Sequence, residues 1–137
     1  MQINRAEARY KAMTILYQIN LYEKNKISYN IEDVIKEQLE IQNDFVNELV
    51  HGVINNKKEI ESIANKYLDN WKLDRLGLTD QAIIEIAIYE IIHTKTPNLV
   101  CINEAIELAK KYSDEKISKM INGILDKIYH DYEDQNK

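Results

Sequence analysis

The stretch DQAIIEIAIYEIIH, residues 80–93, is apolar on most sides when it is drawn as a helix. A surface helix carries one apolar stripe, whereas a helix that is hydrophobic almost all round is buried among its neighbours. We therefore predict that this segment is the central helix of the fold, with Thr79 as its N-terminal cap. It is far shorter than the ~20 apolar residues needed to cross a bilayer, as is every other apolar run in the chain.

The segments on both sides of this stretch repeat their apolar residues at helical spacing, and none is a credible strand. Asn43 and Ser113 are residue types that cap helices, the Asn-Asn pair at 55–56 indicates a turn, and Pro97 ends the connection after residue 93. In chain order, the predicted helices cover Asn4 to Glu23, Ile31 to Leu39, the segment after Asn43, Ile60 to Leu68, the segment after Thr79, INEAIELAKKY (102–112) and the segment after Ser113.

Length and composition agree with a helical domain. The chain has 137 residues, of which 45% are hydrophobic and 30% charged, as is ordinary for a globular protein. Three glycines and one proline are too few for the many tight turns of a β-sandwich or β-barrel. No repeat or linker marks a domain boundary. The sequence therefore predicts an all-α, compact bundle of six or seven helices in a single domain over 1–137, with an acidic tail at 130–137 that frays.

The cysteine content and the N-terminus indicate the compartment. Cys101 is the one cysteine, which excludes an internal disulfide framework and suits a reducing environment. Its neighbours Val100 and Ile102 favour a small buried hydrophobic side chain over a nucleophile. The opening MQINRAEARYKA has no apolar core of a secretory leader. We expect a cytoplasmic protein.

The motifs that would indicate an enzyme are missing. Glu90 and His93 have the spacing found in ferritin-like di-iron sites, but such sites need a second copy, and His51 and His130 do not supply it. There is no phosphate-binding loop, no dinucleotide-binding glycine motif and no nucleophile elbow. We expect neither a metal nor a cofactor, and no catalysis.

Charge is distributed unevenly along the chain. The net charge of −5 combines +3 over residues 1–26, −8 over 27–109, +2 over 110–127 and −2 over 128–137. Positive charge therefore lies at two ends of an acidic body. The alternative is that these charges simply cover solvent-exposed helix faces and have no specific function.

The last predicted helix contains SKMINGILDKIY, residues 118–129, with an Asn-Gly pair inside a helical pattern. On a helical wheel, Gly123 lies on one flank with three lysines, and Met120 borders that flank. Bare backbone there would let a phosphate or a flat ring approach closely, but it would equally let another helix pack tightly. Asn122 points away from the apolar stripe and can donate and accept hydrogen bonds.

Two arginines extend the apolar face of the first predicted helix. Arg5 and Arg9 are one helical turn apart and align with Ala12 and Leu16. Guanidinium groups on such a face can bind phosphates bidentately or stack on bases. The alternative is a surface salt bridge to the acidic middle of the chain, which would contribute little to stability.

Together these features resemble the NusB family of bacterial transcription antitermination factors. INEAIELAKKYS and KMINGILDKI resemble its C-terminal signature, and AEARYKAMTILYQ, LVHGV, the W…RL…D.AI…A.YEI pattern and P..V follow the family's order and approximate spacing. Several separated blocks agree over nearly the whole chain, from about Arg5 to Lys127.

The resemblance implies a NusB-like helical fold and a non-catalytic function. Family members bind the boxA element of nascent transcripts, notably ribosomal RNA leaders. They act together with NusE, a small-subunit ribosomal protein, and with other Nus factors they modify RNA polymerase. The expected partners are therefore single-stranded boxA RNA and NusE, with RNA polymerase and other Nus factors reached indirectly.

The resemblance also assigns sites. Tyr17 on the first helix and Asp80 at the start of the central one match the family's NusE-binding positions. The RNA face is expected at the N-terminus and on the last helix. With the flanking lysines, the predicted RNA-binding residues are Arg5, Arg9, Lys116, Lys119, Met120, Asn122, Gly123 and Lys127.

The sequence departs from the family in places that bear on RNA binding. Glu7 stands between the two N-terminal arginines, and Gln81 and Glu85 replace arginines that many members carry. Met120 replaces a frequent aromatic residue. We therefore expect weaker RNA binding by this chain alone and greater reliance on NusE.

Two alternative functions belong to other classes of protein. One is the NusB-like module of a ribosomal RNA methyltransferase, which would need a catalytic domain beyond Lys137. The other is a homodimeric helical assembly protein, since some family members dimerise.

Overall fold

The computed structural model describes residues 3–132, and this part of the chain forms seven α-helices and one 3-10 turn, with no β-strand. The elements are, in chain order, α1 (Arg5–Lys24), α2 (Ile31–Gln38), α3 (Asp44–Asn55), α4 (Lys57–Tyr67), η1 (Leu73–Arg75), α5 (Leu78–His93), α6 (Asn98–Tyr112) and α7 (Glu115–Asp131). The predicted all-α bundle is confirmed. Residues 130 and 131 of the predicted tail end α7, and residues 133–137 lie outside the described part.

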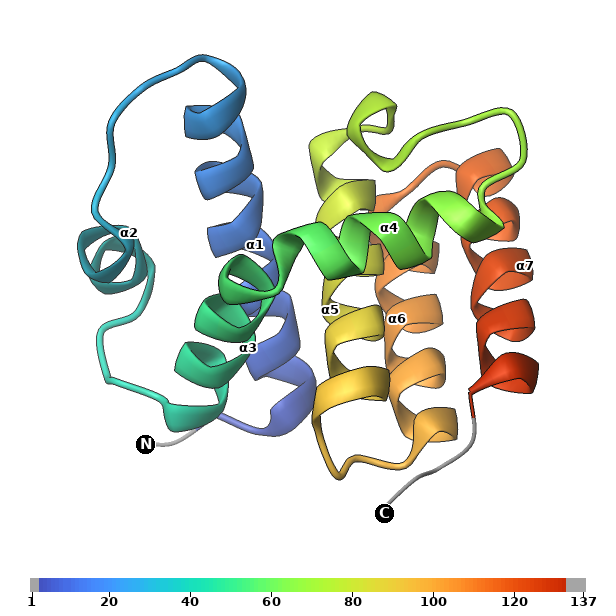
Figure 1. Ribbon diagram of the computed structural model, residues 1–137. Helices are drawn as coiled ribbons and strands as arrows, with labels where there is room; N and C mark the ends of the chain where they lie inside the picture. The colour runs from blue at the N-terminus through green and yellow to red at the C-terminus, as the bar shows by residue number, and fades with distance from the viewer. Residues whose placement is uncertain (1–2, 133–137) are drawn as a thin grey trace.

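Helix α5 lies at the centre of the bundle, as its apolar sequence predicts. Residues 82–91 are all buried, and α5 contacts α1, α3, α4, α6 and α7. In Figure 1, α1, α5, α6 and α7 lie side by side, while α4 runs across α5 and reaches α7. Helices α2 and α3 pack on α1. Consequently α5 and α6 separate the N-terminal helix from the C-terminal one.

Asparagine and aspartate side chains fix the start of four helices. Asn43 Oδ1 accepts a hydrogen bond from the backbone N–H of Val46 at 3.0 Å, so the predicted cap of α3 is confirmed. Asn30 caps α2 in the same way through Asp33 N–H, also at 3.0 Å. Each side chain satisfies a donor that the first helical turn leaves without a partner.

Two predicted caps are wrong by one or two residues. Helix α5 starts at Leu78 after Gly77, because the N–H of Gln81 closes the first turn on the Gly77 carbonyl at 2.9 Å. Thr79 therefore lies inside the helix. Helix α7 is capped by Asp114 rather than by Ser113, which ends α6.

Helix α6 starts four residues earlier than INEAIELAKKY suggests. Pro97 occupies its N-terminal cap with φ of −55°, and Asn98 begins the helix. Proline is suited to this place because it has a fixed φ and needs no intrahelical donor. Cys101 is buried in the first turns of α6, as predicted.

Two carboxylates are buried in the apolar central helix, and each of them is bonded to α1. Glu90 binds Arg9, and Glu85 accepts a hydrogen bond from Asn20 Nδ2 at 2.9 Å. Lys57 Nζ of α4 lies 3.7 Å from Glu85 and also pairs with Glu23. Burial raises the pKa of Glu85, and the nearby Lys57 and Asn20 only partly offset this effect.

Candidate nucleic-acid interface

The N-terminal turn of α1 presents Arg5 to solvent. Asn4 caps the helix by accepting from the N–H of Glu7 at 2.8 Å, and its side-chain amide donates to Glu7 Oε1 at 3.1 Å. This reciprocal arrangement resembles a capping box. Glu7, which separates the two arginines in the sequence, thus has a structural function at the start of the helix.

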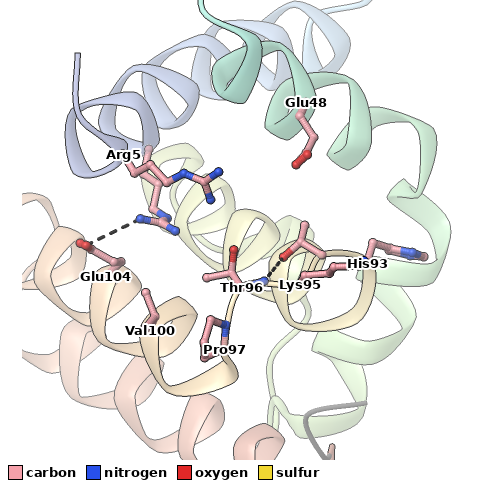
Figure 2. A pocket seen from close by; sticks show the side chains of 10 residues that line it. Arg5, Glu48, His93, Lys95, Thr96, Pro97, Val100 and Glu104 are labelled. Atoms are coloured by element: carbon pink, nitrogen blue, oxygen red, sulfur yellow. Dashed lines mark hydrogen bonds and ion pairs between the residues drawn. The ribbon is translucent and has the colours of Figure 1, made fainter. Parts of the chain in front are cut away.

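Arg5 lines a groove of about 760 Å³ between α1, α3 and the α5–α6 connection. Figure 2 shows Arg5 and Glu104 on one side of it, His93 and Lys95 on the other, and Pro97 below. Within residues 3–132, the structure records no carboxylate partner for the side chain of Arg5 or Lys95. Both cations are therefore available to an anionic ligand that enters the groove.

Arg9, one turn further along α1, is buried and paired with acidic side chains. Its guanidinium donates to both carboxylate oxygens of Glu90, at 2.7 Å and 2.9 Å, and lies 3.6 Å from Glu104. Only 3% of the Arg9 side chain and 1% of the Glu90 side chain are exposed. Burial alone would lower the pKa of Arg9, but the hydrogen bond and the charge of Glu90 outweigh it and raise the pKa.

The expectation that Arg9 is either a surface phosphate ligand or a partner in a surface salt bridge needs correction. Its partner is indeed in the acidic middle of the chain, but the pair is buried because both side chains come from the contact between α1 and α5. Such a bidentate pair holds the two helices in one register. Arg9 is thus placed to support Arg5 rather than to reach solvent.

The lysine flank of α7, defined as Lys116, Lys119, Gly123 and Lys127, is exposed as the wheel predicts. Lys119 lies 3.4 Å from Glu115 and Lys127 lies 3.8 Å from Asp69, both in solvent-exposed pairs. Pairs of this kind are weak, so a polyanion can compete for the lysines. Asn122 is exposed and Met120 half-buried.

A shallow hollow of about 180 Å³ lies beside Gly123, lined by Met120, Lys127 and the end of α4 around Tyr67. A Cβ atom built on Gly123 would meet no atom within 4 Å, apart from its own helix backbone and chain neighbours. Tight helix packing therefore does not explain this glycine. Access for a ligand remains a prediction.

The predicted RNA-binding residues are not brought together. Arg5 and Arg9 lie on α1, while the lysine flank lies on α7, and α5 and α6 stand between these helices (Figure 1). The hollow beside Gly123 opens toward the end of α4, not toward α1. Two separate basic areas thus replace the single face that the sequence suggested.

Tyr17 and Asp80 lie on the adjacent helices α1 and α5. The Tyr17 side chain is 40% exposed. Asp80 is half-buried in the first turn of α5 and accepts a hydrogen bond from the hydroxyl of Ser113. A carboxylate at this place is favoured by the helix dipole, and the hydrogen bond fixes its orientation.

Two residues beside Arg5 were not predicted from the sequence: Lys95, which lines the groove, and Phe45, which contacts Arg5. Lys95 follows α5 in a short connection, and only the folded chain shows that it lines the same groove as Arg5. Phe45 belongs to the first turn of α3, and the guanidinium carbons of Arg5 and Arg9 lie 4.2 Å and 5.1 Å from its ring centroid. Glu90 is a charged residue in an otherwise apolar helix, and buried charges are nearly always paired. The sequence thus indicated that Glu90 has a basic partner, but not which one.

Other possible sites are occupied by local pairs. His93 Nε2 lies 2.5 Å from Glu59, and Glu90 faces Arg9, so the two residues with di-iron spacing have different partners. Among the described residues, no three or more histidine, cysteine or acidic side chains are grouped as metal ligands would be. None of the described helices is long and apolar enough to cross a membrane.

The sequence matches a model of the NusB family over residues 6–130. The chain belongs to the NusB family. A transcription antitermination protein NusB of Listeria innocua is 44% identical over 124 residues, which cover 90% of this chain and 94% of the relative. The protein of the same name in Bacillus subtilis is 39% identical over 132 residues, covering 96% and 98%.

Solved NusB structures have the same fold. NusB of T. maritima matches with a TM-score of 0.81 and 29% identity over 96% of this chain and 94% of that one. A structure of the antitermination factors NusB and NusE in complex with double-stranded RNA matches with a TM-score of 0.80 and 31% identity, covering 93% and 97%. The family resemblance inferred from the sequence is confirmed, and the methyltransferase alternative is not favoured.

Proposed function

We propose that this protein is a transcription antitermination factor that binds boxA RNA of nascent ribosomal RNA transcripts together with NusE. The observation that carries the proposal is family membership over nearly the whole chain, with relatives named as NusB antitermination proteins. The NusB chain in a solved complex of NusB and NusE with double-stranded RNA has the same fold. Through NusE and other Nus factors, the protein modifies RNA polymerase without catalysing a reaction itself, in the bacterial cytoplasm where transcripts are made.

The groove at Arg5 supports RNA binding on physical grounds. Arg5 offers a planar set of donors that matches a phosphate, and Lys95 lines the same groove. The lysine flank of α7 forms a second contact area for the same RNA or for a different segment of it. In this proposal Arg9 contributes by supporting Arg5, while Met120, Asn122 and Gly123 contact bases or backbone near the hollow.

The form of the RNA distinguishes sequence-specific recognition from simple charge attraction. Single-stranded RNA is read through stacking and base edges, whereas double-stranded RNA is recognised mostly by shape and phosphates. With NusE present, boxA RNA should therefore bind more tightly than a scrambled single strand of equal length or a duplex of boxA with its complement. Equal affinity for all three would contradict the proposal.

Charge-matched substitutions test which surfaces bind. Arg5→Ala and Lys95→Ala in the groove, and Lys119→Ala on α7, should each weaken boxA binding severalfold. Lys58→Ala on α4 removes the same charge from an exposed lysine outside both areas and serves as the control. If Lys58→Ala weakens binding as much as the other three, the surfaces are not specific.

We propose that NusE binds at Tyr17 and Asp80. Tyrosine is enriched among interface residues that contribute strongly to affinity, and the Asp80 carboxylate can pair with a basic group. Tyr17→Ala should reduce NusE affinity while leaving the melting temperature nearly unchanged. Asp80→Lys should reduce NusE affinity and also lower the melting temperature, because it places a cation at the N-terminus of α5 and removes the acceptor for Ser113, so its affinity is compared per folded molecule. Tyr17→Phe keeps the ring, and Asp80→Asn keeps an acceptor for Ser113, so each control isolates one property. Unchanged affinity in Tyr17→Ala and Asp80→Lys would place the interface elsewhere.

The homodimer alternative differs in its mass and in its response to RNA. A dimer that covers the N-terminal arginines would have to dissociate when boxA RNA binds. Light scattering with and without RNA would separate this case from a monomer that binds directly.

A further inference from the structure

We propose that Phe45 is a positioning residue for RNA binding, whose ring holds the guanidinium group of Arg5 at the groove. This inference rests on the proposed RNA-binding function. Arg5 is exposed at the first residue of α1, and its guanidinium carbon lies 4.2 Å from the centroid of the Phe45 ring. A cation over an aromatic face at this distance is attracted by the electron-rich ring.

The ring itself is well supported. Phe45 is half-buried against the hydrophobic core, in the first turn of α3. Asn43 caps this turn through the N–H of Val46 at 3.0 Å, next to Phe45 in the chain. The platform under Arg5 is therefore part of a fixed helix start.

Arg9 completes the platform without repelling Arg5. Its guanidinium carbon lies 5.1 Å from the same ring centroid, so two cations share one aromatic side chain. The charge of Arg9 is compensated by two bonds to Glu90 and by Glu104 at 3.6 Å. Arg5 has no such carboxylate partner within residues 3–132, and it keeps an uncompensated charge for a phosphate.

Holding Arg5 in place matters because a free arginine loses rotamer freedom when it binds a ligand. A side chain that is already held near its bound conformation loses less, and its affinity for the ligand is higher. The Phe45 ring therefore contributes to RNA affinity without touching the RNA. Its contribution passes through Arg5 alone.

The test is a double-mutant cycle on boxA RNA binding in the presence of NusE, measured by fluorescence anisotropy with a labelled single strand. Phe45→Leu should weaken binding about two- to fivefold, which corresponds to the loss of an exposed cation–π contact. Phe45→Tyr keeps the ring and should restore wild-type affinity. In an Arg5→Ala background, Phe45→Leu should have no further effect.

Two outcomes overturn the inference. Phe45→Leu could leave affinity unchanged, or it could weaken binding equally with and without Arg5, which would indicate a general structural effect. Thermal melts of each variant show how much protein is folded, and affinities are compared per folded molecule.

A second measurement needs no RNA and separates this inference from the proposed function. The ring current of Phe45 should shift the NMR signal of the Arg5 side-chain Nε–H, and the shift should vanish in Phe45→Leu and persist in Phe45→Tyr. If the shift is present but the wild type binds no boxA RNA with NusE, the proposed function has failed while the contact is real. If the shift is absent, Arg5 is not held and the positioning role is wrong.

Discussion

Gly123 and Gly52 both lie inside helices, but their surroundings differ. A Cβ on Gly123 meets open space, whereas a Cβ on Gly52 would overlap the ring of Tyr89 on α5. The glycine that allows close packing is thus in the LVHGV segment of α3 and not in the Asn-Gly pair of α7. Helical spacing alone does not distinguish the two, because the difference depends on which helix lies opposite.

We expect opposite stability changes from the same substitution at these two positions. Gly123→Ala should stabilise the protein by roughly 0.5–1 kcal/mol, since alanine favours the helix and no neighbour is displaced. Gly52→Ala should destabilise it by about 1–3 kcal/mol, since the Tyr89 ring must move. Urea unfolding of both variants measures the changes. A loss of stability in Gly123→Ala would mean that something packs against the flank.

Binding of boxA RNA by the Gly123→Ala variant tests the remaining explanation for this glycine. If bare backbone admits RNA, the variant should be more stable than the wild type and bind more weakly. Unchanged affinity in a stabilised variant would show that the glycine serves neither purpose.

Glu85 should make stability depend on pH. Burial raises its pKa above the ordinary value of 4.5. A carboxyl group with a raised pKa in the folded state contributes stability that is fully present below pH 4.5 and is lost as the pH rises through the folded-state pKa. Glu85→Gln removes this titration and keeps an acceptor for Asn20. The variant should therefore gain stability relative to the wild type as the pH rises above 4.5, as measured by urea unfolding at several pH values. A stability difference that does not change with pH would contradict the raised pKa.

At the scale of helices, the Arg9–Glu90 pair makes the contact between α1 and α5 sensitive to the loss of one partner. Arg9→Met leaves Glu90 buried without its cation and should cost about 3–5 kcal/mol of unfolding free energy. Replacing both side chains by methionine removes both charges and should recover most of the loss. Urea unfolding of the single and double variants measures the coupling. Additive losses would mean that the two side chains act independently.

Helix positions followed from the sequence because apolar spacing reflects burial, and the central position of α5 followed for the same reason. The starts of α5 and α7 were misplaced, since Thr79, Ser113 and Asp114 are all residue types that can cap a helix. The partner of Arg9 was not predictable, because it lies 81 residues away and the pairing depends on how α1 and α5 pack. The separation of Arg5 from the lysine flank was not predictable either, because it depends on the order of helices across the bundle.

At the scale of the whole molecule, a few exposed cations act on a body with a net charge of −5. RNA affinity should therefore fall with salt, but gently. Each phosphate contact with a single strand contributes about −0.7 to the slope of log affinity against log salt, so two to four contacts predict a slope of about −1.5 to −3. Titrations of boxA RNA with NusE at several salt concentrations measure it. An affinity that does not depend on salt would exclude phosphate binding.

The bonds from α1 to Glu85 and Glu90 also bear on how the chain assembles during synthesis. Helix α1 leaves the ribosome first, but its two carboxylate partners on α5, Glu85 and Glu90, follow Asn20 and Arg9 by 65 and 81 residues. At 5–20 residues per second, the delay for Arg9 is about 4–16 s. During that time α1 can gather with α2 and α3, but the Arg9 guanidinium has no carboxylate from α5. The N-terminal turn that carries Arg5 thus reaches its final form only after the middle of the chain has been translated.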